Sequence, residues 1–198
     1  MKRQEHYFGL TLIISVLLFY ILTLLGCAPT QVKIYPKETR TEKTSPGRPF
    51  PGKTYTEAIS QWKSHEDLVK WMEKDFSFDV ERYKRFEGTL PIPRTPEETF
   101  QLKSGIYIDA VEFSKKTLNQ INPSYKAQTA VILVRPNVLN HYVCAFRKDG
   151  KLFVLDYGTP YKKITGVHGP YNSLDEYKRF YEKHHPEKRR VEGIGFLQ

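Results

Sequence analysis

Cysteine is scarce in this chain of 198 residues, because Cys27 and Cys144 are the only two. They are far apart, so no pair of cysteines has the close spacing of a metal-ligand set. We expect neither a metal nor a cofactor. It also contains no internal repeat. These absences exclude a disulfide-rich scaffold and a zinc- or cluster-binding module built from cysteines.

The N-terminus resembles the lipobox of bacterial lipoproteins. Lys2 and Arg3 form a basic start, residues 10–25 are almost entirely apolar without a charge, and Gly26 precedes Cys27. A small residue before the cut is what a signal peptidase requires. The resemblance implies that residues 1–26 are removed and that Cys27 carries lipid. The alternative is an uncleaved membrane anchor, since an apolar run of about 18 residues approaches spanning length.

Both interpretations place the rest of the chain outside the cytoplasm. Removing residues 1–26 leaves 172 residues, enough for one domain with a core of its own. A lipid on Cys27 would leave Cys144 without a partner for an internal disulfide. In a double-membrane bacterium, Ala28 rather than aspartate after the cysteine favours the periplasmic face of the outer membrane, by resemblance to known sorting patterns.

The mature chain is basic. Lys2, Arg3 and Glu5 leave with the leader, so the formal charge falls from +9 to +8. Outside the cytoplasm, anionic lipid headgroups or envelope polymers are better partners for this charge than nucleic acid, which we do not expect. A soluble surface that is simply basic is the alternative.

Composition divides the mature chain in two. Residues 27–55 contain five prolines among threonine, lysine and glycine and show no apolar periodicity, which is typical of a disordered tether. Residues 56–198 carry apolar periodicity, first of the helical and then of the strand type. The predicted helices cover about 64–76, 95–102, 107–121 and a segment that starts near 173. The predicted strands cover about 130–134, 139–147, 152–157, 161–167 and 190–197. Helices followed by antiparallel strands indicate an α+β domain.

A predicted hairpin brings His141 and Asp156 together. Asp149-Gly150 is a strong signal for a two-residue turn, which pairs Lys148 with Lys151 and continues in that register along both strands. His141 and Asp156 then become diagonal neighbours on one face, about 7–8 Å apart at the backbone. A carboxylate there could orient the imidazole as in a catalytic triad. A three-residue loop would separate them, and an ordinary surface pair is the other alternative.

The residues around this pair resemble the bacterial transglutaminase-like superfamily, which has a papain-like fold. The resemblance rests on Thr95–Thr99 (TPEET), Gly105–Asp109 (GIYID), His141 and Leu155–Gly158 (LDYG). The usual pattern is a Gly-x-Cys-x-Asp segment that opens a helix, a histidine on a strand and an aspartate on the next. The resemblance implies that His141 is the base and Asp156 its orienting residue. Asp109 matches the acidic residue two places after the nucleophile.

The nucleophile position departs from that pattern, because Tyr107 stands where the superfamily has cysteine. A phenol with a pKa near ~10 is a far weaker acyl nucleophile than a thiolate. Ser104 precedes Gly105 and would not lie on the first turn of the helix. Cys144 is three residues from His141 on one strand, so it should point to the opposite face as a buried structural residue. The sequence therefore predicts a triad without its nucleophile.

Two further clusters have weaker patterns. The first could bind an anion or a metal, although a solvated helix end is the more ordinary interpretation, and it comprises His184, His185, Lys188, Arg189 and Arg190. The second could line a groove for a glycan or peptide, although core and rim packing is more usual at helical spacing, and it comprises Tyr171, Tyr177, Phe180 and Tyr181.

Three functions are compatible with these observations. The first is a membrane-anchored module with an inactive transglutaminase-like domain that binds a peptide or an envelope polymer, or has a structural role. The second is an active hydrolase or acyltransferase that uses His141 and Asp156 with a nucleophile other than cysteine. The third is a plain structural protein of the envelope without a ligand.

Overall fold

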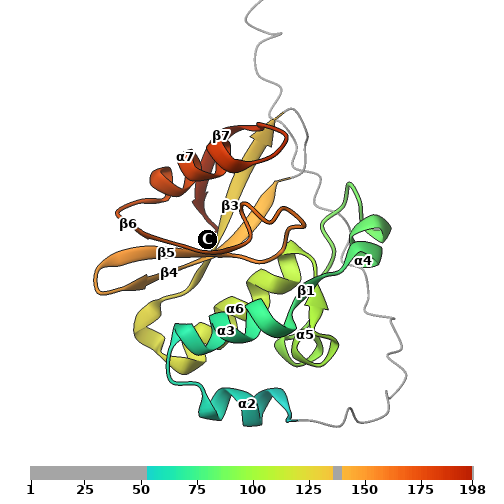
Figure 1. Cartoon of the computed structure of the whole chain (residues 1–198), viewed down its shortest axis with the longest axis vertical. Helices are drawn as coiled ribbons and strands as arrows, with labels where there is room; N and C mark the ends of the chain where they lie inside the picture. Colours follow the sequence, from blue (N-terminus) through green and yellow to red (C-terminus); the bar gives the residue numbers. More distant parts are fainter. Residues whose placement is uncertain (1–52, 136–139, 198) are drawn as a thin grey trace, which may run out of the picture. The chain divides into compact units, whose positions relative to one another are not determined.

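A five-stranded antiparallel sheet forms the centre of the protein, whose computed structural model describes residues 53–135 and 140–197. The strand order is β6-β5-β4-β3-β7 (Figure 1). The strands are β3 (Gln128–Arg135), β4 (His141–Lys148), β5 (Lys151–Asp156), β6 (Gly166–Tyr171) and β7 (Arg190–Phe196). The expected leader, the lipid on Cys27 and nearly all of the expected tether lie outside the described residues.

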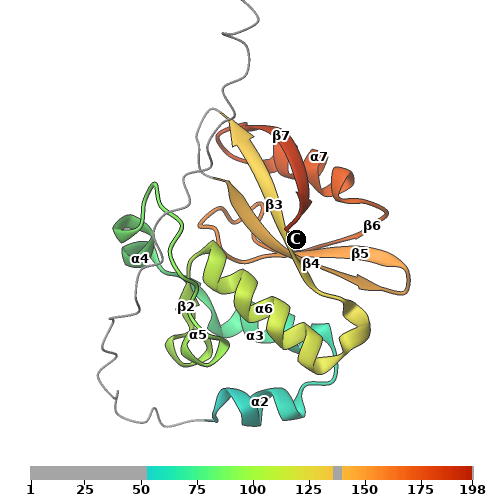
Figure 2. The same ribbon diagram turned by 180° about the vertical axis from the view of Figure 1, so that it is seen from behind.

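Helices cover both faces of the sheet. One face packs on a layer that contains α2 (Tyr55–Gln61), α3 (His65–Asp75), α5 (Pro96–Leu102) and α6 (Tyr107–Ile121), whereas the other packs on α7 (Leu174–His184) (Figures 1 and 2). Alternation along each strand supplies both cores. Cys144 contributes to the first core, and its neighbours Val143 and Ala145 contribute to the second. The predicted α+β class is confirmed.

Short elements complete the helical layer. Strands β1 (Ser77–Phe78) and β2 (Ser104–Gly105) pair in parallel, and helix α4 (Val80–Arg85) follows β1 directly. A 3₁₀ turn, η1 (Pro123–Tyr125), leads from α6 into β3. None of the helices in the described part of the chain is long and apolar enough to cross a bilayer.

The hairpin between β4 and β5 has the predicted register. Asp149 and Gly150 both have positive φ, 52° and 74°, as a two-residue turn of this twist requires. Lys148 therefore pairs with Lys151, and Cys144 with Leu155. The three-residue loop is excluded, so the face on which each side chain of these strands lies follows from the sequence.

The start of α5 is also as predicted. The Thr95 hydroxyl accepts a hydrogen bond from the Glu98 amide at 3.2 Å, and the Glu98 carboxylate accepts one from the Thr95 amide at 2.8 Å. This reciprocal cap satisfies two amides that the helix itself leaves unpaired. Pro96 occupies the first turn, where its missing N–H costs nothing.

Two boundaries differ from the prediction. The strand expected over 161–167 is wrong, because the amides of Ile164 and Thr165 both donate to the Tyr161 carbonyl and close a turn. Strand β6 begins only at Gly166. At the N-terminal side, Tyr55, which the expected tether includes, lies in α2 and is buried.

Candidate functional site

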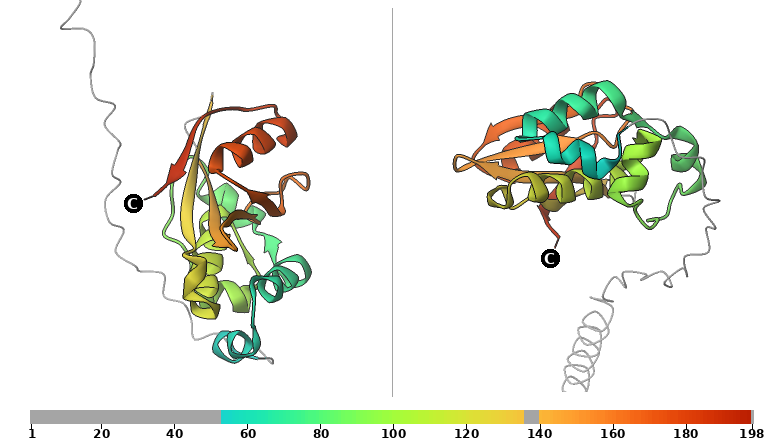
Figure 3. Two further views of the ribbon diagram at one scale, coloured as in Figure 1. Left: turned by 90° about the vertical axis from the view of Figure 1, so that its left-hand side faces the viewer. Right: turned by 90° about the horizontal axis from the view of Figure 1, so that it is seen from below.

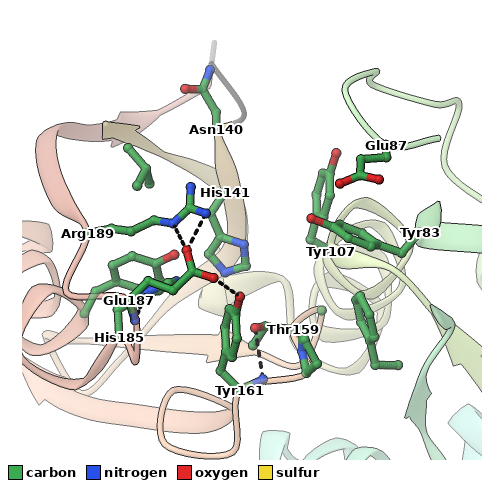
Figure 4. Close-up of a pocket in the computed structure, with 15 residues that line it drawn as sticks. Tyr83, Glu87, Tyr107, Asn140, His141, Thr159, Tyr161, His185, Glu187 and Arg189 are labelled. Atoms are coloured by element: carbon green, nitrogen blue, oxygen red, sulfur yellow. Dashed lines mark hydrogen bonds and ion pairs between the residues drawn. The ribbon is translucent and has the colours of Figure 1, made fainter. Parts of the chain in front are cut away.

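A cleft of about 350 Å³ lies where β4 begins and β5 ends, at the open end of the hairpin and opposite its turn. One wall comes from β1, α4 and α6 and contains Tyr83, Glu87 and Tyr107 (Figure 4). The opposite wall comes from the segment after β5, from α7 and from the segment between α7 and β7. Its side chains are Tyr161, Tyr181, His185, Glu187 and Arg189, of which all except Tyr181 are labelled in Figure 4. His141 lies between the two walls.

His141 and Asp156 form the predicted pair. The Nε2 atom of His141 lies 2.8 Å from Oδ2 of Asp156, whose side chain is completely buried. The Tyr177 hydroxyl donates to the same carboxylate oxygen at 2.9 Å. The Tyr181 ring stacks on the imidazole, with ring centres 5.5 Å apart. These contacts hold the imidazole ring in one orientation.

The orientation of His141 decides what its second nitrogen can do. When Asp156 accepts the proton on Nε2, Nδ1 carries a lone pair and can accept a hydrogen bond or a proton. Nδ1 makes no hydrogen bond to any group in the described residues. A carboxylate that fixes the tautomer and a ring nitrogen that faces a cleft have the geometry that the base half of a triad requires.

Tyr107 begins α6 on the opposite side of the cleft. Its ring centre is 6.3 Å from that of His141, and the ring stacks on Tyr142 at 5.7 Å. Its hydroxyl lies 3.4 Å from the Thr89 carbonyl, to which it donates a long hydrogen bond. Burial raises the pKa of the Tyr107 phenol to about 12. The phenol therefore stays protonated at neutral pH.

The end of β5 packs directly on the start of α6. A Cβ built on Gly158 would lie 2.0 Å from the Cα of Tyr107, which is far inside van der Waals contact. Only glycine permits this approach. It fixes the distance between the helix N-terminus and the strands that carry His141 and Asp156.

Asp109 supports the helix and is not part of the cleft. It is fully buried and forms an ion pair with Arg82, whose Nε donates to Oδ2 at 2.8 Å. The same carboxylate accepts the amides of Ile106 at 3.0 Å and Arg94 at 2.8 Å. Asp109 thus caps α6 and joins it to α4 and to the segment before α5.

The other cysteine and serine candidates lie away from the pair. Cys144 is completely buried in the core on the α6 face, as predicted, and burial raises the pKa of its thiol to about 12. Ser104 belongs to β2 and does not line the cleft. Neither residue can therefore attack a group held beside His141 in this arrangement.

The opposite wall of the cleft, which carries His185, Glu187 and Arg189, contains residues whose role the sequence did not reveal. His185 is buried rather than solvated at the helix end, so the ordinary interpretation is wrong for this residue. Its Nδ1 accepts the Glu187 amide at 3.2 Å, and burial lowers the pKa of the imidazole. Glu187 also accepts from Tyr161 at 2.8 Å and pairs with Arg189. The described residues contain no group of three or more histidine, cysteine, aspartate or glutamate side chains that could hold a metal ion.

A sequence signal for His185 exists. Tyr177, Tyr181 and His185 follow one another at intervals of four, so they lie on one face of α7. Tyr177 and Tyr181 are buried in the core, which confirms core packing for them rather than a groove of exposed rings. Only Tyr181 of the four aromatic residues in that cluster also lines the cleft.

An α+β fold with a strand histidine, an aspartate on the next strand and a helix N-terminus across a cleft defines a papain-like domain. The family of transglutaminase-like domains matches residues 55–181, more than half of the chain, and the chain therefore belongs to this family. A search among curated proteins found no match.

Proposed function

We propose that the protein is a lipid-anchored envelope protein whose transglutaminase-like domain is inactive in acyl transfer and binds a peptide or an envelope polymer. The single observation that carries this proposal is the chemistry at the start of α6. Tyr107 has the nucleophile's place in the family pattern, yet its phenol is held protonated and is bonded to Thr89. His141 then has no thiol to activate, because Cys144 lies in the core on the α6 face.

The cleft supports binding by the groups it offers. Both walls carry aromatic rings, which stack on sugar or peptide groups, and both carry carboxylates that accept hydrogen bonds. Glu187 and Arg189 pair with each other, so this part of the wall presents donors and acceptors without a net charge. Such a surface suits a polar polymer chain better than a small ion.

The N-terminal sequence supports the proposed anchor. Lipid on Cys27 would hold the domain at a membrane, and the basic mature chain would favour an anionic surface. In a double-membrane bacterium, Ala28 after the cysteine would favour the periplasmic face of the outer membrane, where a polymer of the envelope would be within reach.

We expect His141→Ala to leave the hydrolysis of amide and ester substrates unchanged. The imidazole has no nucleophile to deprotonate, so its loss removes no step of acyl transfer. The measurement compares initial rates of the wild type and the variant on a panel of activated esters and peptide amides. Tyr142→Ala, which changes the neighbouring side chain on β4, is the control. A clear loss of rate in His141→Ala alone would favour an active hydrolase with a noncysteine nucleophile.

We expect Cys27→Ser to abolish lipid labelling. Cells that express the wild type should incorporate a clickable fatty acid into the protein, whereas the variant has no thiol at the cleavage site to accept it. Cys144→Ser is the matched control and should label like the wild type, because Cys144 is buried. Equal labelling of the wild type and Cys27→Ser would show that the protein is not a lipoprotein.

A further inference from the structure

A small lobe beside the cleft exposes apolar side chains. We call residues 79–95, which comprise α4 and the segment that leads to α5, the α4 lobe. Val80, Leu90 and Ile92 in this lobe are 48%, 52% and 58% exposed. The lobe stands at one side of the domain, away from the sheet (Figures 1, 2 and 3). Three of the eight large apolar side chains that are exposed in the described residues therefore lie within this one segment.

The lobe is braced from inside. The Arg82 guanidinium donates to the Ile92 carbonyl at 2.8 Å while it pairs with the buried Asp109. Arg94 pairs with Asp79 at 2.9 Å and closes the lobe at its base. The prolines on either side of Ile92 fix φ at two further positions. The backbone around Ile92 therefore has little conformational entropy left to lose on binding.

The charges of the lobe do not oppose contact with a bilayer. Its exposed ionisable side chains are two acids and two bases, namely Glu81, Glu87, Lys84 and Arg85. Glu81 and Lys84 lie 3.4 Å apart. The lobe is thus close to neutral, within a chain that carries a net positive charge.

We propose that the α4 lobe rests on the membrane and inserts Leu90 and Ile92 at the boundary between headgroups and acyl chains. This rests on the proposed function, because the occupant follows from the lipid on Cys27. Residues 28–52 join that lipid to the described domain and span at most about 90 Å. The bilayer is then always within reach, and tethering makes even a weak contact effective. Apolar side chains on a rigid surface element bind at such a boundary.

Membrane contact by the lobe also positions the cleft. Tyr83 and Glu87 belong to the α4 lobe and line one wall of the cleft. A lobe seated on the bilayer holds the mouth of the cleft close to the membrane surface. The ligand would then be a polymer segment that lies near the membrane.

A site-directed fluorophore tests this contact in the intact lipoprotein. Leu90→Cys and, as the matched control, Leu102→Cys each receive an environment-sensitive maleimide dye, and the protein is reconstituted in vesicles that contain nitroxide-labelled lipid. Leu102 is 47% exposed but lies in α5, outside the lobe. Cys144 is buried and does not compete for the dye. We expect several-fold stronger quenching at position 90 than at position 102, with a blue-shifted emission. Equal quenching at the two positions would overturn the proposal.

Other outcomes of this experiment distinguish membrane contact by the α4 lobe from lipidation of Cys27 and from binding of a second copy of the chain. Energy transfer between dyes at position 90 without lipid quenching would identify a second copy as the occupant and overturn the proposal. Attachment of the maleimide dye to the wild type, which has no cysteine at position 90, would show that the Cys27 thiol is free and that the proposed lipid anchor is wrong. The dye at position 90 is then measured on a Cys27→Ser chain mixed with the same vesicles. Quenching that Ile92→Ser weakens by about tenfold supports the lobe contact, and no quenching overturns it.

Discussion

Tyr107→Cys should create a thiol that reacts with iodoacetamide well below pH 8. The substitution places sulfur on the first turn of α6, where the helix dipole and the nearby His141 favour a thiolate. An ordinary cysteine titrates near ~8.5. At pH 6 we therefore expect the new thiol to be alkylated at least about tenfold faster than an exposed cysteine. The measurement is the pH dependence of the alkylation rate in a Cys27→Ser background.

Two controls identify the source of this reactivity. Tyr83→Cys places a thiol in the same cleft but on α4, so it should titrate as an ordinary cysteine. Adding His141→Ala to Tyr107→Cys should raise the pKa of the thiol again, because the imidazole that would accept its proton is gone. Cys144 is buried and gives little background. A Tyr107→Cys thiol that titrates like the one at position 83 would show that the helix no longer aims at the His141–Asp156 pair.

The second large effect concerns stability. Asp109→Asn should lower the free energy of unfolding by about 3–5 kcal/mol, because it leaves the buried Arg82 guanidinium without its anion. The variant also weakens the acceptor of the Ile106 and Arg94 amides. Urea denaturation followed by tryptophan fluorescence measures the change.

The Lys103–Asp75 pair provides a matched comparison for that variant. Its atoms also lie 2.8 Å apart, but both side chains reach solvent. Asp75→Asn should therefore cost no more than about 1 kcal/mol. Similar losses for Asp75→Asn and Asp109→Asn would contradict the role of the buried ion pair. A lower free energy of unfolding for Asp109→Asn, with that of Asp75→Asn unchanged, would support this role.

The sequence predicted those parts of the fold that depend on local signals. The Asp149-Gly150 turn sets the register, and the register brings His141 to Asp156. The cap at Thr95 and the apolar spacing after Tyr107 set the starts of two helices. Each of these signals acts within a few residues, which is why a single sequence reveals it.

The parts that were not predicted depend on contacts between distant segments. The turn after β5 forms because the amides of Ile164 and Thr165 donate to the Tyr161 carbonyl, and the pattern of apolar residues does not predict these hydrogen bonds. Helix α4 has only six residues and depends on the Arg82–Asp109 pair, which joins segments 27 positions apart. The far wall of the cleft combines the Tyr161 segment with His185 and Glu187, so its existence requires the tertiary fold.

The close packing of Gly158 on Tyr107 depends on the backbone and Cβ of residue 107, whereas the chemistry of the cleft depends on the rest of that side chain. The atoms of residue 107 that a Cβ on Gly158 would meet first are the nitrogen, Cα and Cβ, which every residue type except glycine possesses. The side chain beyond Cβ can therefore change without altering the seam between α6 and the sheet. We therefore expect a single substitution at position 107 to change the chemical reactivity of the domain while the packing of α6 on the sheet stays the same.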